Sequence, residues 1–181
     1  DKTEFSRHTL DMIKRKIATA AVRSLFNSHP VVGIIGARQV GKTTLAHQIA
    51  AQDKRPHTFF DLENSEDISR LADPMMALKD LKGIIIIDEI QKCPDIFSSI
   101  RVLADRPRKP ARFIVLGSAS PALLKQSSET LAGRIMYHEL RGFAIDEVGM
   151  GNAEQLWLRG GFPRSFLAPS IKASYDWRRG F

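Results

Sequence analysis

The segment of residues 36–43, GARQVGKT, restricts the possible folds of this chain more than any other part of the sequence. Glycine, four residues, glycine, lysine and threonine form the pattern of a loop that wraps a phosphate chain. Such a loop joins a strand to a helix, because its backbone N–H groups and the positive end of the helix must converge on one point. Residues 30–35 are a short apolar, β-branched run, and Leu45, Ala46 and Ile49 follow at helical spacing. The sequence therefore predicts strand, loop and helix in this order.

Four positions of the motif have an expected role. Gly36 and Gly41 have no Cβ atom, so the backbone can approach the phosphates closely at these positions. Lys42 is expected beside the β- and γ-phosphates as a point charge, and the Thr43 hydroxyl is expected as a magnesium ligand. The alternative is a glycine turn with a surface lysine. The predicted nucleotide-binding residues are Gly36, Ala37, Arg38, Gln39, Val40, Gly41, Lys42, Thr43 and Thr44.

A second motif begins with four consecutive isoleucines, residues 84–87, and ends in Asp88 and Glu89. At the carboxyl end of a parallel sheet, Asp88 would lie beside the phosphate loop and hold magnesium through water. Glu89 would then be free to polarise the attacking water and accept its proton, while Lys42 stabilises the transition state. The alternative is an ordinary strand that ends in acidic residues at a turn.

The rest of the chain alternates between strand and helix patterns. Strands are expected at residues 57–61, 112–116 and 135–138, and helices at residues 9–26, 65–81 and from Pro94 onward. Asp73-Pro74 should interrupt the second of these helices, and Ser120-Pro121 should begin a further one. Alternating strands and helices predict an α/β protein with a parallel sheet and helices on both of its faces.

Two further side chains are candidates for contact with the γ-phosphate. Ser118 follows the apolar run of residues 112–116, so it is expected to bond the γ-phosphate or orient the water; a serine in a glycine-serine turn is the alternative. Arg134 is the candidate arginine for the γ-phosphate, acting within its own chain or on a neighbouring subunit. Arg38 and Arg141 compete for this role.

Composition excludes some classes of function and leaves others open. The longest apolar run has four residues, far fewer than the roughly 20 that cross a bilayer, so we expect no membrane span and a cytoplasmic protein. The single cysteine, Cys93, has no partner for an internal disulfide. The formal charge of +7 would attract phosphate-bearing partners, including nucleic acid, although the short basic groups are also typical of solvated turns. Self-association or a protein partner is also open.

Taken together, these motifs resemble a known family: bacterial and archaeal AAA-type ATP-binding proteins that carry a carboxy-terminal domain of unknown function. The stretches that carry the resemblance are GARQVGKTTL (36–45), IDEIQKCP (87–94), LGSAS (116–120), ETLAGR (129–134) and GGFP (160–163). It spans about residues 7–169. It implies a three-layer P-loop NTPase fold with strand order 5-1-4-3-2, and it implies that Ser118 is a sensor of the γ-phosphate.

The resemblance also suggests a division of the chain. Residues 1–29 would be an N-terminal helix and lead-in, residues 30–169 the ATPase core, and residues 170–181 a truncated connection to a missing carboxy-terminal domain. Tyr175, Trp177 and Phe181 are expected to pack as core residues rather than to mark this connection. Residues 7–10 are the candidate contact for adenine.

Three functions compete at this stage. The first is a magnesium-dependent ATPase that acts as a nucleotide-driven conformational switch. The second is a nucleotide or small-molecule kinase, which would share the loop but would need a lid and an acceptor pocket; no arginine-rich lid pattern is present, and Asp88-Glu89 suits the activation of water. The third is a nucleic-acid-binding module that uses ATP as a ligand, which the positive charge favours.

Overall fold

The computed structural model describes residues 13–107, 111–120, 125, 127 and 129–181. The expected adenine contact at residues 7–10, the first part of the helix expected at residues 9–26, and Pro121 lie outside these residues. The chain divides into two compact units, one of residues 18–141 and the other of residues 142–181 together with the described residues 13–17.

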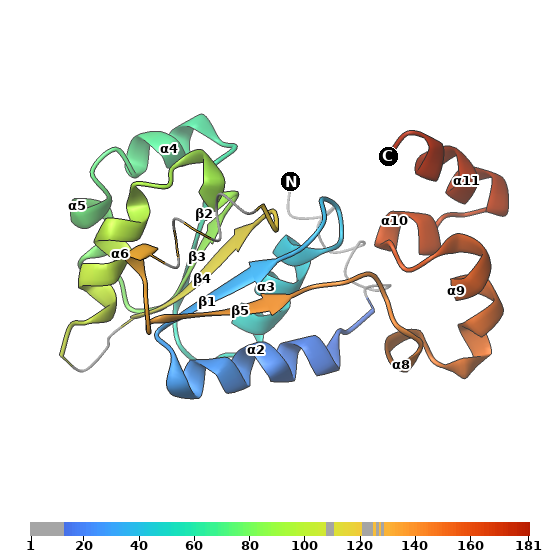
Figure 1. Cartoon of the computed structure of the whole chain (residues 1–181), viewed down its shortest axis with the longest axis horizontal. Helices are drawn as coiled ribbons and strands as arrows, with labels where there is room; N and C mark the ends of the chain where they lie inside the picture. Colours follow the sequence, from blue (N-terminus) through green and yellow to red (C-terminus); the bar gives the residue numbers. More distant parts are fainter. Residues whose placement is uncertain (1–12, 108–110, 121–124, 126, 128) are drawn as a thin grey trace. The chain divides into compact units, whose positions relative to one another are not determined.

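A parallel sheet of five strands is the framework of the unit of residues 18–141 (Figure 1). The strands are β1 (Val31–Ile35), β2 (His57–Asp61), β3 (Gly83–Asp88), β4 (Ala111–Gly117) and β5 (Ile135–Glu139). Their order across the sheet is β2-β3-β4-β1-β5, which confirms the predicted order 5-1-4-3-2 read from the opposite edge.

Position in the sheet explains the composition of each strand. The three inner strands carry side chains buried on both faces: every residue of β1 and β3 is buried, and in β4 only Arg112 is not. Continuous apolar runs suit such strands, because helices cover both faces of a parallel sheet. The edge strands β2 and β5 are mostly half-buried or exposed, which explains their polar residues such as His57, Asp61 and Glu139.

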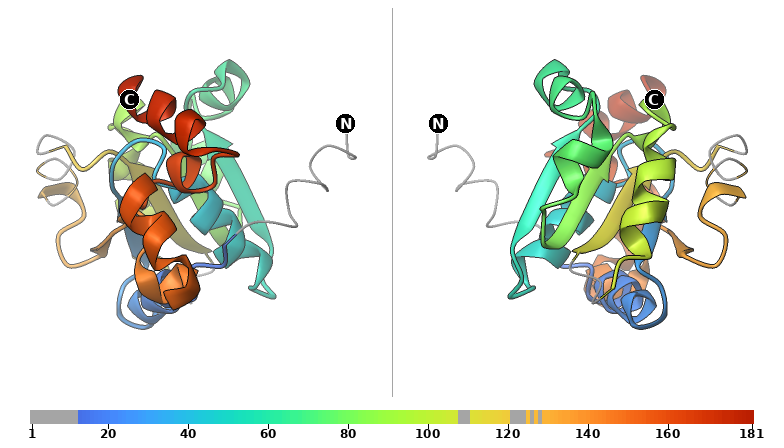
Figure 2. Two further views of the ribbon diagram at one scale, coloured as in Figure 1. Left: turned by 90° about the vertical axis from the view of Figure 1, so that its right-hand side faces the viewer. Right: turned by 90° about the vertical axis from the view of Figure 1, so that its left-hand side faces the viewer.

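Helices pack against both faces of this sheet, so the predicted three-layer α/β arrangement is correct (Figures 1 and 2). In this unit the structure has α2 (Lys16–Ser28), α3 (Lys42–Ala51), α4 (Ser65–Arg70), α5 (Pro74–Leu78), α6 (Ile96–Ala104) and the short 3₁₀ helix η1 (Ile90–Lys92), the first residues of α2 belonging to the other unit. Side chains of α5 and α6 pack with Ile85, Ile87 and Phe113 on one face. The α2 and α3 helices cover the opposite face, where Ile34 and Ile86 are also fully buried.

Local chemistry accounts for two helix boundaries. The interruption expected at Asp73-Pro74 is confirmed: the Asp73 side chain accepts a hydrogen bond from the Met76 N–H and caps α5, with Pro74 in its first turn. The helix expected from residue 9 is shorter than predicted, because residues 13–15 are not helical and α2 begins at Lys16.

The unit of residues 142–181 consists of short helices. They are α8 (Ile145–Val148), η2 (Met150–Asn152), α9 (Ala153–Arg159), α10 (Pro163–Phe166) and α11 (Ile171–Arg179). A buried ion pair, Arg15 Nε to Glu147 Oε1 at 2.8 Å, ties residue 15 to α8. The hydroxyl groups of Ser165 and Ser174, 2.8 Å apart and buried, join α10 to α11.

The expectation that the final aromatic residues pack as core is wrong for two of them. Tyr175 is 54% exposed and Phe181 is 59% exposed. Trp177 is partly buried and stacks at an angle on Phe162 and Phe181, with ring centroids 5.7 and 5.1 Å away. Since α11 is only nine residues long and has Ser174 as its one buried residue, most of its side chains remain on the surface.

None of the helices in the described residues is both long enough and apolar enough to cross a membrane.

Candidate functional site

All parallel strands of the sheet end at the same edge, and the two predicted motifs meet there. The loop of residues 36–41 follows β1 directly, and Asp88 is the last residue of β3. The β4 strand lies between them, so the residues after β4 also reach this edge. A crevice at the carboxyl ends of parallel strands is the usual ligand position in open α/β sheets.

Backbone geometry explains the glycines of the loop. Gly36 and Gly41 have φ values of +154° and +101°, which side chains disfavour. A Cβ atom at Gly36 would also lie 2.3 Å from the carbonyl oxygen of Leu140, so no side chain fits there. Gln39 takes a positive φ of 59° without being glycine. The loop is thus folded tightly onto the end of β5.

The side chain of Lys42, the first residue of α3, turns back towards the loop. Its Nζ donates hydrogen bonds to the carbonyl oxygens of Gly36 and Ala37 at 3.1 and 3.0 Å. The residue is only 6% exposed. Burial lowers the pKa of Lys42, while the nearby carboxylates Glu89 and Asp88 act in the opposite direction. A buried ammonium group with neutral acceptors is well placed to exchange them for an anion.

Thr43 and Asp88 form the direct contact between the two motifs. Thr43 Oγ1 donates to Asp88 Oδ2 at 2.6 Å, and the Glu89 N–H donates to Asp88 Oδ1 at 2.8 Å. Asp88 is 5% exposed, and burial raises its pKa, although the Thr43 hydrogen bond opposes the shift. A hydroxyl and a carboxylate in contact offer oxygen ligands of the kind that magnesium prefers. Within the described residues no group of three or more His, Cys, Asp or Glu side chains forms a metal cage, so any magnesium here would rely on this pair together with substrate and water oxygens.

Glu89 stands at the edge of the site in an unusual backbone conformation. Its φ and ψ are 52° and 43°, in the left-handed region that non-glycine residues rarely adopt. This conformation turns the chain from β3 into η1, one residue after the metal-ligand candidate. Such strain often accompanies a functional site.

Gln91 is a residue that the sequence analysis did not single out. Its Nε2 donates a hydrogen bond to Glu89 Oε2, so it holds the carboxylate. Its Oε1 is buried and has no hydrogen-bond partner in the described structure. Gln91 lies within the IDEIQKCP stretch, but nothing in the spacing of the sequence pointed to a role for it, because the contact depends on the turn at Glu89.

Ser118 is the first residue after β4. It follows β4 at the carboxyl edge, on the strand between β1 and β3, and it is partly buried. The structure therefore brings Ser118 to the same edge as Lys42 and Asp88.

Arg134 is the one predicted site residue that lies at the wrong edge. It precedes β5, whose first residue, Ile135, pairs with Val31 at the start of β1, five residues before the loop. Five residues of strand span roughly 17 Å. Arg134 is also engaged, because Nε and Nη2 donate to the two carboxylate oxygens of Asp105 at 2.7 and 2.8 Å. In this structure Arg134 therefore lies far from the phosphate loop of its own chain.

The two competing arginines, Arg38 and Arg141, lie at the carboxyl edge of the sheet, as the phosphate loop does. Arg38 is part of the loop, and its exposed side chain approaches Glu63 at 3.7 Å. Arg141 comes two residues after β5, pairs with Glu139 at 3.2 Å and is 80% exposed. Because β5 runs parallel to β1, Arg134 before it and Arg141 after it lie at opposite edges of the sheet.

Comparison with known proteins agrees with this geometry. Residues 28–149 match the model of a family described as an AAA domain. Two uncharacterized proteins, from Mycobacterium tuberculosis and Mycobacterium bovis, are each 49% identical to the chain over 170 residues, which is 94% of this chain and 38% of theirs. The chain thus spans well under half the length of these curated relatives.

Solved structures show the same fold at low identity. A Walker-type ATPase of Pyrococcus abyssi matches with a TM-score of 0.62 and 14% identity, over 92% of this chain and 71% of that one. A signal transduction ATPase with numerous domains and a tetratricopeptide repeat sensor, from Pyrococcus horikoshii, matches with a TM-score of 0.55 and 17% identity, over 86% and 29%. These matches indicate a shared architecture.

Proposed function

Because the chain belongs to the AAA-domain family of P-loop ATPases, we propose that it binds ATP with magnesium at residues 36–44 and hydrolyses the γ-phosphate. The observation that carries the proposal is the 2.6 Å hydrogen bond from Thr43 to Asp88. These residues come from separate motifs 45 positions apart, and their contact joins the phosphate loop to the acidic end of β3.

Binding of the phosphates rests on the loop and on Lys42. The two hydrogen bonds from Lys42 Nζ to loop carbonyl oxygens stand where β- and γ-phosphate oxygens would accept instead. The backbone N–H groups at the start of α3 add the positive end of a helix. Residues Ala37, Arg38, Gln39, Val40 and Thr44 contribute to the nucleotide site through their place in this loop and in the first turn of α3.

Thr43 and Asp88 would hold magnesium. Both offer oxygen atoms, and Asp88 is buried against the loop, so the fit to the ion is good. Magnesium supplies positive charge that offsets the charge of the phosphate oxygens.

The hydrolytic step is assigned to Glu89. Glu89 follows Asp88 in the chain, and its carboxylate accepts a hydrogen bond from Gln91, which holds it at the edge of the site. In this position Glu89 orients a water molecule and accepts its proton as the water oxygen attacks the γ-phosphorus. The bond from the γ-phosphorus to the oxygen that bridges it to the β-phosphate breaks, and ADP leaves. Lys42 stabilises the charge on the transferred group, and Ser118 bonds a γ-phosphate oxygen or the water.

A switch follows from the same contacts. With the γ-phosphate present, Lys42, Ser118 and Glu89 share one ligand; after its release each returns to a partner within the protein, as Lys42 has in this structure. A change in these three contacts would be transmitted to the segments after β3 and β4.

The first test is magnesium-dependent binding of a fluorescent ATP analogue to the chain and to a Lys42→Ala variant, with ADP and GTP as competitors. We expect tight binding to the parent, loss of binding in the variant, and weaker competition by GTP. Equal binding to both proteins would contradict the assignment of the loop.

Release of inorganic phosphate then tests hydrolysis. A Glu89→Gln variant should bind the ATP analogue as the parent does but release phosphate at least about 100-fold more slowly, which is the usual contribution of a general base. Unchanged release in this variant would exclude Glu89 as the base. Phosphate that appears only on an added acceptor would identify a kinase instead.

A further inference from the structure

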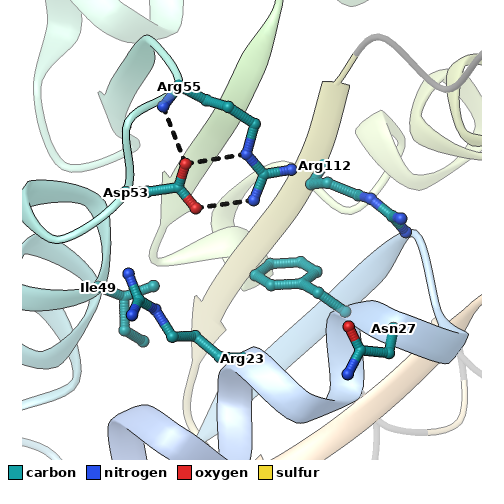
Figure 3. A pocket seen from close by; sticks show the side chains of 7 residues that line it. Arg23, Asn27, Ile49, Asp53, Arg55 and Arg112 are labelled. Atoms are coloured by element: carbon teal, nitrogen blue, oxygen red, sulfur yellow. Dashed lines mark hydrogen bonds and ion pairs between the residues drawn. The ribbon is translucent and has the colours of Figure 1, made fainter.

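A polar hollow lies in the unit of residues 18–141, away from the phosphate loop (Figure 3). Its volume is about 260 Å³, which is room for a polyatomic anion and several waters at roughly 30 Å³ per water. Phe26 and Ile49, both buried, form its apolar side. Arginines from three separate segments form the rest of the lining together with Asn27 and Asp53.

Three arginines line this hollow. Arg23 comes from α2, Arg55 precedes β2 and Arg112 belongs to β4, as Figure 3 shows. Asp53 is the only carboxylate among the lining residues, so positive charge exceeds negative charge by two. Burial lowers the pKa of Arg112, and the charge of Arg55 lowers it further, which shows that like charges oppose one another here.

The single carboxylate is already committed to one arginine. Asp53 accepts hydrogen bonds from Arg55 Nε at 2.9 Å and from Arg55 Nη2 at 2.8 Å. This fork holds the pKa of Asp53 at about 2, so the carboxylate stays ionised. The pair is therefore held in place, and the excess positive charge lies on Arg112 and on Arg23, whose charge also lowers the pKa of Asp53.

Arg23 and Arg112 retain donors for a ligand. Arg112 Nη1 donates to the carbonyl oxygen of His29 at 3.2 Å, which uses one of its five N–H groups. Within the described part of the chain, no hydrogen bond or ion pair engages the Arg23 side chain. A planar guanidinium fork matches the geometry of a phosphate group.

This hollow is separate from the nucleotide site. Arg55 stands before the first residue of β2 and Arg112 near the first residue of β4, so both lie at the amino edge of the sheet. The phosphate loop lies at the opposite edge. The α3 helix connects the two, since it begins at Lys42 beside the loop and carries Ile49 in its last turns.

We propose that Arg23, Arg112 and Arg55 form a second anion site that binds a phosphate group. The phosphate is either free inorganic phosphate or the phosphodiester of a nucleic acid strand, both of which offer the same oxygen acceptors. Its binding relieves the repulsion among the arginines, and Asp53 keeps Arg55 in place while Arg23 and Arg112 donate to the anion.

The test measures the affinity of two probes, inorganic phosphate and a short oligothymidylate, by calorimetric titration. All proteins carry Lys42→Ala, which removes the main cation of the phosphate loop, so the result does not depend on the function proposed for that loop. Arg23→Gln and Arg112→Gln are compared with Arg101→Gln, an exposed arginine on α6 that removes the same charge outside the hollow. Thermal melting of each variant checks that it is folded.

We expect each of Arg23→Gln and Arg112→Gln to weaken binding about tenfold, as the loss of a charged hydrogen-bond donor does, and Arg101→Gln to leave it within about twofold. If Arg23→Gln and Arg112→Gln weaken the binding of both probes, the site takes free phosphate. If they weaken only the binding of the oligothymidylate, and its affinity for the Lys42→Ala parent falls between ~50 and ~200 mM salt, the source of the phosphate is a nucleic acid. Equal affinities in all three variants, or no binding of either probe to the Lys42→Ala parent, would overturn the proposal.

Discussion

Asp88 serves two requirements that conflict at low pH. Burial raises its pKa, so the ligand-free protein holds the proton of this carboxyl group more tightly than an unfolded chain does. The protonated Asp88 therefore contributes to the stability of the folded state. This contribution is complete at pH values below the ordinary aspartate pKa of 3.8, and it is lost as the pH rises through the raised pKa of Asp88. Magnesium, by contrast, needs the ionised form.

We therefore predict that the affinity for the magnesium nucleotide falls on acidification, beginning at a pH above the ordinary pKa of aspartate. The measurement is a titration of the fluorescent ATP analogue over a pH series with magnesium present. Asp88→Asn is the control, and it should bind the analogue weakly and with little dependence on magnesium. An affinity that stays constant down to pH values near 4 would contradict this account.

Gln91 acts on hydrolysis through Glu89. Its amide donates to the Glu89 carboxylate and contacts no residue of the phosphate loop among the hydrogen bonds of the described structure. We predict that Gln91→Leu lowers kcat about tenfold and leaves KM nearly unchanged. The Glu89 carboxylate loses the hydrogen bond that holds it, while the contacts of the phosphate loop with the nucleotide are unchanged. Steady-state phosphate release over a range of ATP concentrations measures both constants. A rise in KM with constant kcat would place Gln91 in nucleotide binding instead.

At the scale of elements, the loop and the end of β5 are built against each other. The Leu140 N–H donates to the Ile35 carbonyl oxygen at 2.7 Å, and the Leu140 oxygen occupies the space where a Gly36 side chain would begin. We predict that Gly36→Ala destabilises the fold by about 2–3 kcal/mol and abolishes nucleotide binding, since both the backbone angle and the close contact oppose a methyl group.

Gly133→Ala is the matched control for this prediction. Gly133 also has a positive φ, +70°, but its missing Cβ would meet nothing within 4 Å. It should cost only the backbone strain, about 1 kcal/mol, and should leave nucleotide binding intact. Urea denaturation of both variants measures the difference, and equal losses would show that the contact with Leu140 is unimportant.

Elements with strong local signals were predictable from the sequence. The isoleucine run of β3 predicted a buried strand, and the glycine-lysine pattern before α3 predicted a phosphate loop. Asp73-Pro74 predicted a break between helices. The edge at which Arg134 stands was also predictable, because Arg134 directly precedes the strand expected at residues 135–138 and a parallel strand begins at the amino edge. The hydrogen bond from Gln91 to Glu89 was not predictable, since the left-handed turn at Glu89 creates it.

At the scale of the whole molecule, one of the two units has a spectroscopic probe of its own. The chain has two tryptophans, Trp157 and Trp177, and both belong to the unit of residues 142–181. Tryptophan fluorescence therefore reports on this unit, while far-UV circular dichroism reports on all helices and strands together.

The ion pair of Arg15 and Glu147 is the strongest candidate for a structural anchor of that unit. Arg15 donates through Nε and Nη2 to the two carboxylate oxygens at 2.8 and 2.9 Å, and both side chains are less than a tenth exposed. We predict that Arg15→Gln destabilises this unit by about 3–5 kcal/mol, because it leaves Glu147 buried without its charged partner. Denaturation followed by tryptophan fluorescence measures the loss.

Lys172→Gln is the control for the buried pair. Lys172 and Asp176 form an exposed pair on α11, with side chains 85% and 51% exposed, so its removal should change stability by less than about 0.5 kcal/mol. If the two variants unfold at the same denaturant concentration, the Arg15 pair contributes no more than a surface contact.

The place of Arg134 also restricts the orientation of the copies in any assembly in which it serves catalysis. It stands at the amino edge of the sheet, and the phosphate loop stands at the carboxyl edge. Two copies related by a twofold axis would therefore have to run antiparallel, so that Arg134 of each copy faces the loop of the other. A head-to-tail arrangement would instead make this contact once per interface, and it would either close into a ring or grow as a filament.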